Sequence, residues 1–372
     1  MSGTVAFVWD NFGPLHVDRC NAVARALGQG QSVVGIEIFR KSDTYEWDNP
    51  PAAGFEKVTL FEEGSWSETG AGAIARAIGN ALAEHGCEAV FFCHYDKPAI
   101  LMAASRARMA RRKVFTMGCS KFDDLPRTPM RELAKRQFLR PYQGAIASLD
   151  RSVDYFRWLG LDKERVLGGY NTVDQARIKA LAGTPDAQPR GHADRPFLAV
   201  ARLVSKKNLG LLLRAYARYR PLVARPRQLR IAGSGPLEGE LKSVAVDLGI
   251  ADHVDWLGFV QTDRVAREMR DALCLVLPST VEQFGNVVPE ALALALPVLA
   301  SNRCGAADRL VLDGVSGFTF HPKNEQGLAA LMEWVGADEA LWLRLRKGAE
   351  ATAPLGDTAR FAESVLQLLA QS

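Results

Sequence analysis

The stretch that decides the fold reads LPSTVEQFGNVVPEALALALPVLAS and runs from Leu277 to Ser301. It predicts an apolar strand that ends at Leu277, a polar loop, a helix that begins after Gly285 and Asn286, and a second strand from Pro297. A strand, a helix and another strand in this order are typical of a parallel sheet covered by helices. The stretch therefore predicts an α/β fold.

The same alternation of short apolar runs and helix-like segments extends to both sides of this stretch. The predicted strands are Val5–Trp9, Ser32–Phe39, Ala89–Cys93, Lys113–Thr116, Gly144–Ala147, Phe197–Ala201, Gln228–Ala232, Val254–Trp256, Leu273–Leu277, Pro297–Ala300 and Gly317–Phe320. Segments such as His16–Leu27, Ala71–Glu84 and Ala99–Ala110 are rich in Ala, Leu and Arg and predict helices. Two successive sets of this kind predict two doubly wound, Rossmann-like domains.

One segment separates the two sets. The sequence GTPDAQPRGHADRP, residues 183–196, combines Gly, Pro and polar residues without periodicity and predicts a linker. We therefore expect a first domain over residues 1–182, a second over 197–356, and an amphipathic helix over 357–371. Because doubly wound sheets bind ligands at the carboxyl ends of their strands, we expect the domains to face each other across a cleft.

The deciding stretch also carries groups that suit a nucleotide. A helix amino terminus offers unpaired N–H groups to a diphosphate, and Gly285 permits a close approach of the backbone. Glu290, about one turn into the helix, suits the two vicinal hydroxyls of a ribose. Taken alone, Glu290 is explained by the helix dipole and Glu282 by solvation. The ordered combination favours a binding site.

Three further strand ends supply candidate residues. In VARLVSKKN, residues 200–208, Arg202 and Lys207 follow a predicted strand and suit a departing diphosphate. The alternative, solvated charges that open a helix, conflicts with the helix dipole. We expect Gly233, in the AGSGP turn, to lie near the nucleotide, and Val260, at the end of WLGFV, to contact the base.

Together, ARLVSKKN, AGSGP, WLGFV and EQFGNVVPE resemble the nucleotide-binding domain of glycosyltransferase family 4, which has the GT-B fold. The resemblance covers roughly residues 197–320, and Glu282 and Glu290 look like the E-x7-E pattern of that family. It implies transfer of a sugar from a UDP- or GDP-sugar with retention of configuration and without metal or cofactor. It also implies that the helix over residues 357–371 packs back on the first domain. It further implies that Arg202 and Lys207 hold the diphosphate and Glu290 the ribose. The residues it implies around the donor sugar are Glu282, Phe284, Gly285, Asn286 and Val287.

The first domain resembles the family less closely. Family members carry a Gly-Gly loop after the first strand, whereas this sequence has Gly13 followed by Pro14, which removes a backbone donor. The family also places a histidine after a central strand, and His94 fits this position. We expect Gly13 and His94 at the donor, with His16 as the weaker candidate; a purely structural His94 is the alternative.

A retaining transfer of this kind has little need of a strong general base, because the leaving diphosphate can accept the proton of the acceptor. The resemblance implies catalytic roles for His94, Glu282, Arg202 and Lys207, mainly through positioning and charge stabilisation. We find no metal-binding motif, and interpret Asp123 and Asp124 as a turn or a solvated pair.

Charge is concentrated in one region. Of a net charge of +4, residues 97–140 contribute twelve Lys or Arg against three Asp or Glu. Arg127, Arg131 and Lys135 recur every four residues and predict one helical stripe, which we interpret as a solvated face. An excess of this size also predicts attraction to an anionic membrane surface or to a lipid-linked or phosphorylated acceptor. Nucleic acid is disfavoured, since no binding motif accompanies the charge.

Other features concern the cellular compartment. Asp10 interrupts the apolar start, so we expect no signal peptide, and the apolar run 291–300 is about half of a membrane span. The six cysteines include no Cys-x-x-Cys pair and predict reduced thiols. We therefore expect a cytoplasmic protein that associates with the inner face of a membrane.

Three competing functions remain open on the sequence. A GT-B sugar-nucleotide epimerase or phosphorylase would use a similar cleft, although the two spaced glutamates favour family 4. A dinucleotide-dependent oxidoreductase is disfavoured, since neither domain opens with G-x-G-x-x-G. A non-catalytic sugar-nucleotide binding protein would share the same residues. Donor sugar, base, acceptor and oligomeric state are not encoded in a readable motif.

Overall fold

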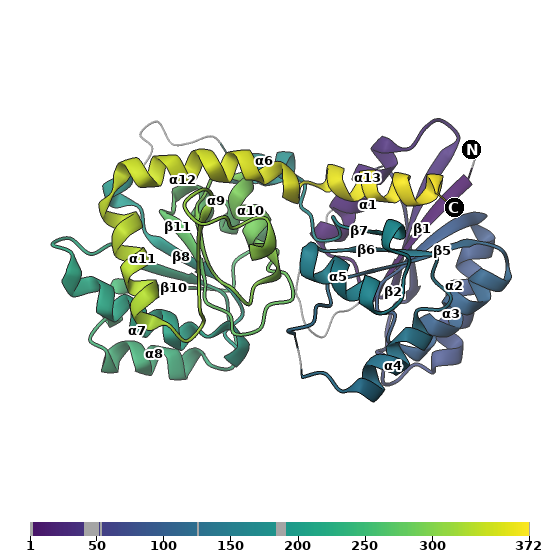
Figure 1. Ribbon diagram of the computed structural model, residues 1–372, viewed down its shortest axis with the longest axis horizontal. Helices are drawn as coiled ribbons and strands as arrows, with labels where there is room; N and C mark the ends of the chain where they lie inside the picture. The colour runs from purple at the N-terminus through teal and green to yellow at the C-terminus, as the bar shows by residue number, and fades with distance from the viewer. Residues whose placement is uncertain (1–2, 41–51, 53, 125, 184–190, 372) are drawn as a thin grey trace. The chain divides into compact units, whose positions relative to one another are not determined.

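The computed structural model describes residues 3–40, 52, 54–124, 126–183 and 191–371. The chain forms two compact units (Figure 1). The first comprises Met1–Asp174 with Thr358–Ser372, and the second comprises Gln175–Asp357. The units thus divide before residue 182, where the sequence predicted the end of the first domain. Part of the predicted linker, residues 184–190, lies outside the described residues.

The first unit is built on a seven-stranded parallel sheet in the order β3-β2-β1-β4-β5-β6-β7. Its strands are β1 (Gly3–Trp9), β2 (Gln31–Phe39), β3 (Glu56–Phe61), β4 (Cys87–Phe92), β5 (Lys113–Gly118), β6 (Gly144–Ala147) and β7 (Val166–Leu167). Its helices are α1 (Pro14–Ala26), α2 (Ala71–Glu84), α3 (Pro98–Met109), α4 (Pro129–Phe138), α5 (Asp150–Trp158) and α13 (Thr358–Ala370).

Helices cover both faces of this sheet because its strands are apolar on both sides. Along β1, Ala6 and Val8 pack into one core with α2, α3 and α5, whereas Phe7 and Trp9 pack into another with α1 and α13. The carboxyl-terminal helix α13 contacts α1 and β6, and its Phe361 ring lies 5.6 Å from that of Phe7 (Figure 1). The last helix of the chain thereby completes the core of the first unit.

The second unit is built on a six-stranded parallel sheet in the order β10-β9-β8-β11-β12-β13. Its strands are β8 (Phe197–Val200), β9 (Leu229–Ala232), β10 (Val254–Gly258), β11 (Cys274–Leu277), β12 (Val298–Ser301) and β13 (Gly317–Phe320). Its helices are α6 (Gln175–Ala182), α7 (Leu209–Tyr219), α8 (Glu238–Asp247), α9 (Thr262–Asp271), α10 (Val287–Ala293), α11 (Glu325–Ala337) and α12 (Glu339–Thr352).

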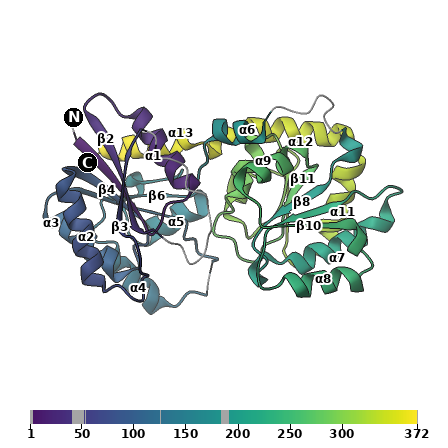
Figure 2. The same cartoon turned by 180° about the vertical axis from the view of Figure 1, so that it is seen from behind.

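The two faces of the second sheet are also covered. Helices α7, α8 and α11 pack into the main core, while α9 contacts β8 and α10 contacts β12 from the other side (Figures 1 and 2). The predicted α/β class and the two doubly wound sheets are therefore confirmed. Two strands, β3 and β7, were not predicted: β3 is half-exposed at the sheet edge, and β7 has only two residues.

The predicted solvated stripe of Arg127, Arg131 and Lys135 is wrong. Arg127 precedes α4, which begins at Pro129, and Lys135 is only 8% exposed. Lys135 and Arg127 both form ion pairs with Glu132, and their side chains are therefore directed into the protein. Only Arg131 remains on the exposed face.

The interpretation of Asp123 and Asp124 is half right. Both lie in a turn, but Asp124 is buried and pairs with the buried Lys121 at 2.7 Å, while Asp123 pairs with Lys121 at 3.1 Å. They are not a solvated pair, because this buried ammonium requires carboxylate partners.

No helix among the described residues combines the length and apolar character that a membrane crossing requires.

Candidate functional site

The strand order of the second unit creates a point where two loops diverge. From β8 the chain proceeds to β9 and β10 on one side, whereas β11 leads to β12 and β13 on the other. Since β8 and β11 are adjacent and parallel, their following loops leave the same edge of the sheet in opposite directions. Such a switch point is where open α/β sheets bind ligands.

The loop after β8 carries the predicted cations Arg202 and Lys207. Arg202 is exposed, and Lys207 ends a short 3-10 turn, Ser205–Lys207. The next residue, Asn208, has a left-handed backbone with φ of 55°, and its Nδ2 donates to the Pro278 carbonyl at 3.0 Å. Asn208 therefore ties this loop to the loop after β11.

The loop after β11 places Glu282 against Lys207. The two side chains form an ion pair, with exposed fractions of 14% and 16%, and the Ser279 hydroxyl donates to Glu282 Oε2 at 3.1 Å. The pair lies at the switch point, because it joins the loops of β8 and β11. A carboxylate thus orients the ammonium that the sequence assigned to a diphosphate.

The backbone around Gly285 is held by the loop after β12. Cys304 Sγ donates to the Phe284 carbonyl at 2.8 Å, and the Gly305 N–H donates to the Glu282 carbonyl at 3.2 Å. Gly285 has φ of 97°, and a Cβ there would lie 2.9 Å from Cys304 Sγ. Only glycine fits this position, and it fixes the path of the chain from Glu282 into α10.

Helix α10 begins after Asn286 and carries Val287 and Glu290. Glu290 is half-buried, and its N–H lies 3.5 Å from the Asn286 carbonyl. The helix has seven residues, about two turns, so its dipole is small. The chemical argument for an anion at this edge therefore depends on the loop cations rather than on the helix.

Gly233 and Val260 follow β9 and β10, the two strands on one side of β8. Gly233, with φ of 140°, lies so close to the β8 loop that a Cβ would be 1.9 Å from the Ala201 carbonyl oxygen. The Leu203 N–H donates to the Ser234 carbonyl at 2.9 Å, which joins the two loops. Val260 follows β10 and is partly exposed. The candidates of the second unit thus share the carboxyl edge of one sheet.

The first unit has a corresponding switch point between β1 and β4, the strands before Asp10 and His94. His94 Nε2 lies 3.3 Å from Asp10 Oδ1, and both side chains are about one-third exposed. His94 has a left-handed backbone with φ of 59°, which costs about 1–3 kcal/mol for a non-glycine residue. Such strain is typical of functional sites.

The surroundings of His94 favour its protonated form. The electrostatic interaction with the Cys93 side chain raises the pKa of His94 well above its ordinary value; burial opposes the rise and the hydrogen bond to Asp10 supports it. Burial would raise the pKa of Asp10, but His94 holds it below the usual range. Tyr170 completes the cluster, since its hydroxyl lies 3.4 Å from Cys93 Sγ and accepts from Trp9 Nε1 at 2.9 Å.

Gly13 and His16 have a local structural role. His16 Nδ1 accepts a hydrogen bond from the Gly13 N–H at 2.9 Å at the start of α1. Burial, followed by the nearby charge of Arg19, lowers the pKa of His16 to about 3. The imidazole is therefore neutral, as an acceptor must be, and the Gly13 N–H is already occupied.

Sequence reasoning missed Asp10, Cys93 and Tyr170. Asp10 and Cys93 stand at the ends of two predicted strands, so their position was a usable signal. Recognising that Asp10 and Cys93 lie close together also requires the strand order, which places β1 beside β4. Among the described residues, no three His, Cys, Asp or Glu side chains gather as a metal ion would require.

A pocket of about 370 Å³ lies elsewhere in the second unit. It is lined by residues of α6, by Arg270 and by the carboxyl-terminal end of α10, including Leu292 and Ala293. None of the predicted site residues lines it. The pocket therefore does not bear on the predicted site.

Residues 185–352 match the model of the family described as glycosyl transferases group 1. Two curated relatives illustrate the range. A D-inositol 3-phosphate glycosyltransferase of Streptomyces bingchenggensis is 30% identical over 61% of this chain and 52% of its own. A GDP-mannose-dependent alpha-(1-6)-phosphatidylinositol monomannoside mannosyltransferase of Mycolicibacterium smegmatis is 34% identical over 37% of this chain and 39% of its own. The matches thus span about a third to three-fifths of such relatives' lengths.

Solved structures match the whole chain at low identity. Sucrose-phosphate synthase from Thermosynechococcus elongatus has a TM-score of 0.74 and 17% identity, covering 99% of this chain and 98% of that one. Anabaena HepE in complex with UDP and glucose has a TM-score of 0.73 and 18% identity, covering 100% of both chains. These likenesses confirm the GT-B fold, as two parallel-sheet Rossmann-like units.

Proposed function

We propose that the protein is a retaining glycosyltransferase that binds a nucleoside-diphosphate sugar at the carboxyl edge of the second sheet. Support comes from the group 1 match over residues 185–352 and from the residues gathered at that edge. The observation that carries the proposal is the Lys207–Glu282 ion pair at the switch point between β8 and β11. It provides an oriented cation where such sheets bind phosphates.

In the proposed reaction, the bond between the anomeric carbon and the diphosphate oxygen breaks, and the electron pair leaves with the diphosphate. The acceptor hydroxyl attacks the same face of the anomeric carbon, and its proton passes to the departing oxygen. Lys207 and Arg202 stabilise the negative charge that develops, which is worth most in a site that excludes water. Glu290 accepts hydrogen bonds from the ribose hydroxyls.

For the first unit, we propose that His94 donates a hydrogen bond to the donor sugar. A protonated imidazole has two N–H donors and no free lone pair, so it cannot act as a general base. One N–H is directed at Asp10, which fixes the ring, and Cys93 is the second hydrogen-bond partner of the imidazole, so the sugar hydroxyl would share the second N–H with Cys93. This role agrees with a mechanism in which the diphosphate takes the proton.

The donor and acceptor classes guide the choice of ligands. HepE was solved with UDP and glucose, and the mycobacterial relative is named for GDP-mannose, so UDP- and GDP-sugars are the first donors to test. We propose an acceptor that is lipid-linked or otherwise anionic, because the basic excess of residues 97–140 would attract one. We further propose a cytoplasmic location.

A thermal-shift comparison tests the donor site. The protein is heated with UDP, GDP, ADP, NAD and nucleotide sugars, and the measurement is repeated with Glu290→Gln. A ligand at a hundredfold excess over its Kd should stabilise the protein by about 2.7 kcal/mol. We expect one nucleoside diphosphate to raise the Tm, and Glu290→Gln to abolish that rise.

The matched control is Glu339→Gln, which changes an exposed glutamate in the first turn of α12. It should keep the full ligand-induced shift. A shift with NAD alone, or none with any nucleotide sugar, would refute the proposal. Product analysis separates the remaining functions: an epimerase alters the donor without an acceptor, and a binding protein turns over neither.

A further inference from the structure

Helix α4 is turned the opposite way from an ordinary amphipathic helix. Its buried side chains are Glu132 and Lys135, exposed by only 3% and 8%, while Met130 and Leu133 are exposed by 86% and 60%. A surface helix of a folded protein normally buries its apolar side chains and exposes its charges. Packing in the core of the first unit therefore does not explain why residues 130 and 133 are apolar.

The inward face of α4 is fixed by a compact polar network. Tyr155 donates to Glu132 Oε2 at 2.5 Å, and Lys135 Nζ donates to Glu132 Oε1 at 3.1 Å and to the Tyr155 hydroxyl at 2.7 Å. The Arg127 guanidinium lies over the Tyr155 ring at 4.5 Å. Rotating α4 to bury Met130 would break this network and leave buried charges unpaired. The inverted orientation is thus the stable one.

The outward face of α4 has apolar residues in its middle and arginines at its edges. Met130, Leu133 and Ala134 lie on one side at helical spacing, with Arg131 and Arg136 on the two flanks, and all five are exposed. The only carboxylate of the helix, Glu132, points inward. Among the described residues Arg131 and Arg136 form no ion pair, although Arg136 donates to the Trp158 carbonyl at 2.9 Å. Apolar side chains framed by such cations suit an anionic partner that also has an apolar interior.

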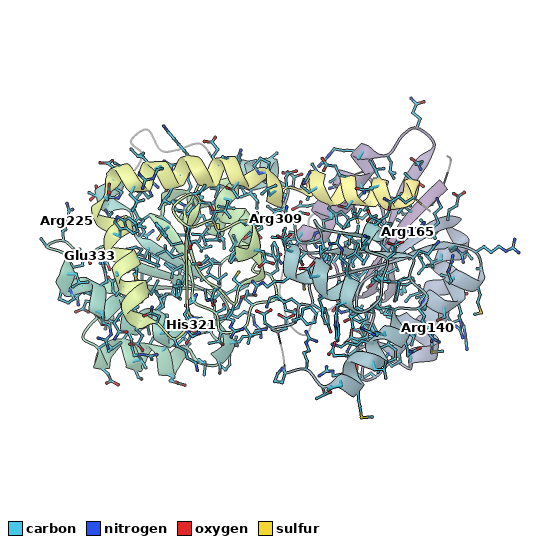
Figure 3. All side chains as sticks on the ribbon, viewed as in Figure 1. Arg140, Arg165, Arg225, Arg309, His321 and Glu333 are labelled. Atoms are coloured by element: carbon cyan, nitrogen blue, oxygen red, sulfur yellow. The ribbon has the colours of Figure 1, made fainter. Side chains whose placement is uncertain are left out.

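Two exposed aromatic residues lie beside Arg136. Phe122 and Trp158 are exposed by 42% and 45%, and their rings lie 5.2 Å apart. The Arg136 guanidinium lies 5.0 Å from the centre of the Trp158 ring. Arg140, labelled in Figure 3, is exposed just after the helix. Aromatic rings beside arginines are typical of the boundary between lipid headgroups and acyl chains.

We infer that the outward face of α4 binds the surface of an anionic lipid bilayer. Met130 and Leu133 would enter the headgroup region, and Arg131 and Arg136 would contact lipid phosphates. This face is much narrower than the basic region 97–140, since Arg127 and Lys135 of that region are directed inward, where they share Glu132. The inference is independent of the sugar transfer, because it concerns exposed residues outside the donor site.

Vesicle flotation tests this inference. Vesicles of phosphatidylglycerol and phosphatidylcholine are compared with pure phosphatidylcholine, at low and high salt. We expect binding to the anionic vesicles at low salt only. Arg131→Gln with Arg136→Gln should weaken the partition coefficient by about fivefold for each arginine. Met130→Ser with Leu133→Ser should weaken it by about tenfold without changing the charge.

Two controls match these changes. Val246→Ser alters an apolar residue of α8 that is 65% exposed, and Arg218→Gln with Arg225→Gln removes two exposed arginines of the second unit. Neither should affect flotation. Circular dichroism and the nucleotide-induced Tm shift should be unchanged in every variant, which separates lipid binding from folding and from donor binding.

Three outcomes would overturn the inference. The first is absence of binding to anionic vesicles at low salt, and the second is equal binding of the Met130→Ser, Leu133→Ser variant. The third is a dimer, detected by light scattering, that this variant dissociates, since a second copy would then cover the face.

Discussion

His94 Nε2 lies 3.3 Å from Asp10 Oδ1, at the point where the loops after β4 and β1 diverge. The second unit has the same relationship, because Lys207 and Glu282 pair where the loops after β8 and β11 diverge. In each sheet the strand order, and not proximity in sequence, brings a cation to a carboxylate. Each unit thereby presents an oriented charge at the edge where open α/β sheets commonly bind ligands.

His94 should keep its proton to a higher pH than an ordinary histidine does, because its pKa is raised. Because Cys93 is the largest cause of its raised pKa, Cys93→Ser should lower that pKa more than Asp10→Asn does. A raised pKa in the folded state stabilises the protein fully below the unfolded value near 6.5, and this contribution is lost as the pH rises through the folded value. NMR of labelled histidine measures the titration. A wild-type His94 that titrates near 6.5 would contradict the assignment.

Binding of the donor diphosphate by Lys207 can be tested separately from the ion pair of Lys207 with Glu282. Lys207→Gln should lower kcat by about a hundredfold, as for removal of one preorganised donor to a developing charge. Lys206→Gln is the matched control, since it removes an exposed cation from the same turn and should have little effect. Steady-state kinetics with the active nucleotide sugar gives both values.

A double variant distinguishes the two explanations of a loss at Lys207. If Lys207 serves only to neutralise Glu282, then Lys207→Gln combined with Glu282→Gln should recover activity. If Lys207 binds the diphosphate, the double variant should remain as impaired as Lys207→Gln. Recovery would remove Lys207 from the proposed mechanism.

Gly285 should be intolerant of a side chain. Gly285→Ala forces alanine to φ of 97° and brings its Cβ within 2.9 Å of Cys304 Sγ, so we expect a loss of about 1–3 kcal/mol in the free energy of unfolding. The control is Gly239→Ala in α8, where no atom lies within 4 Å of the added Cβ. That change should stabilise the helix by about 0.5–1 kcal/mol. Urea denaturation measures both, and an equally stable Gly285→Ala would contradict the expected strain.

The sequence predicted the bounds of several elements correctly. Gly144–Ala147, Gly317–Phe320 and the helix Ala71–Glu84 have the predicted bounds. Burial of charged residues was the main failure, as at Lys135. Its inward orientation depends on Tyr155, which comes from another helix and has no periodic relation to α4. Periodicity identifies the faces of a helix, but only tertiary partners decide which face is buried.

The candidate residues show the same limit. The loop from Glu282 to Glu290 could be proposed as a site because its residues are local in sequence, and its role stays a prediction. Asp10 was not recognised as the partner of His94, since the pairing requires knowing that β1 and β4 are neighbours. Residues joined by a parallel sheet carry no spacing rule, because any crossover length can separate them.

His16 should make the first unit sensitive to acid. Its Nδ1 accepts from the Gly13 N–H, and its pKa of about 3 is far below the value near 6.5 expected in the unfolded chain. The unfolded state therefore binds a proton that the folded state does not, so stability falls as the pH drops from about 6.5 towards 3. Glutamine at this helix position keeps an acceptor for the N–H but cannot be protonated. Accordingly, at pH 4 His16→Gln should have a free energy of unfolding about 2 kcal/mol higher than the wild type, measured by urea denaturation. At pH 7 the two proteins should be equally stable. The exposed His321, labelled in Figure 3, provides the control, because His321→Gln should leave the acid sensitivity unchanged. Equal acid sensitivity in His16→Gln and the wild type would show that a neutral His16 does not hold the start of α1.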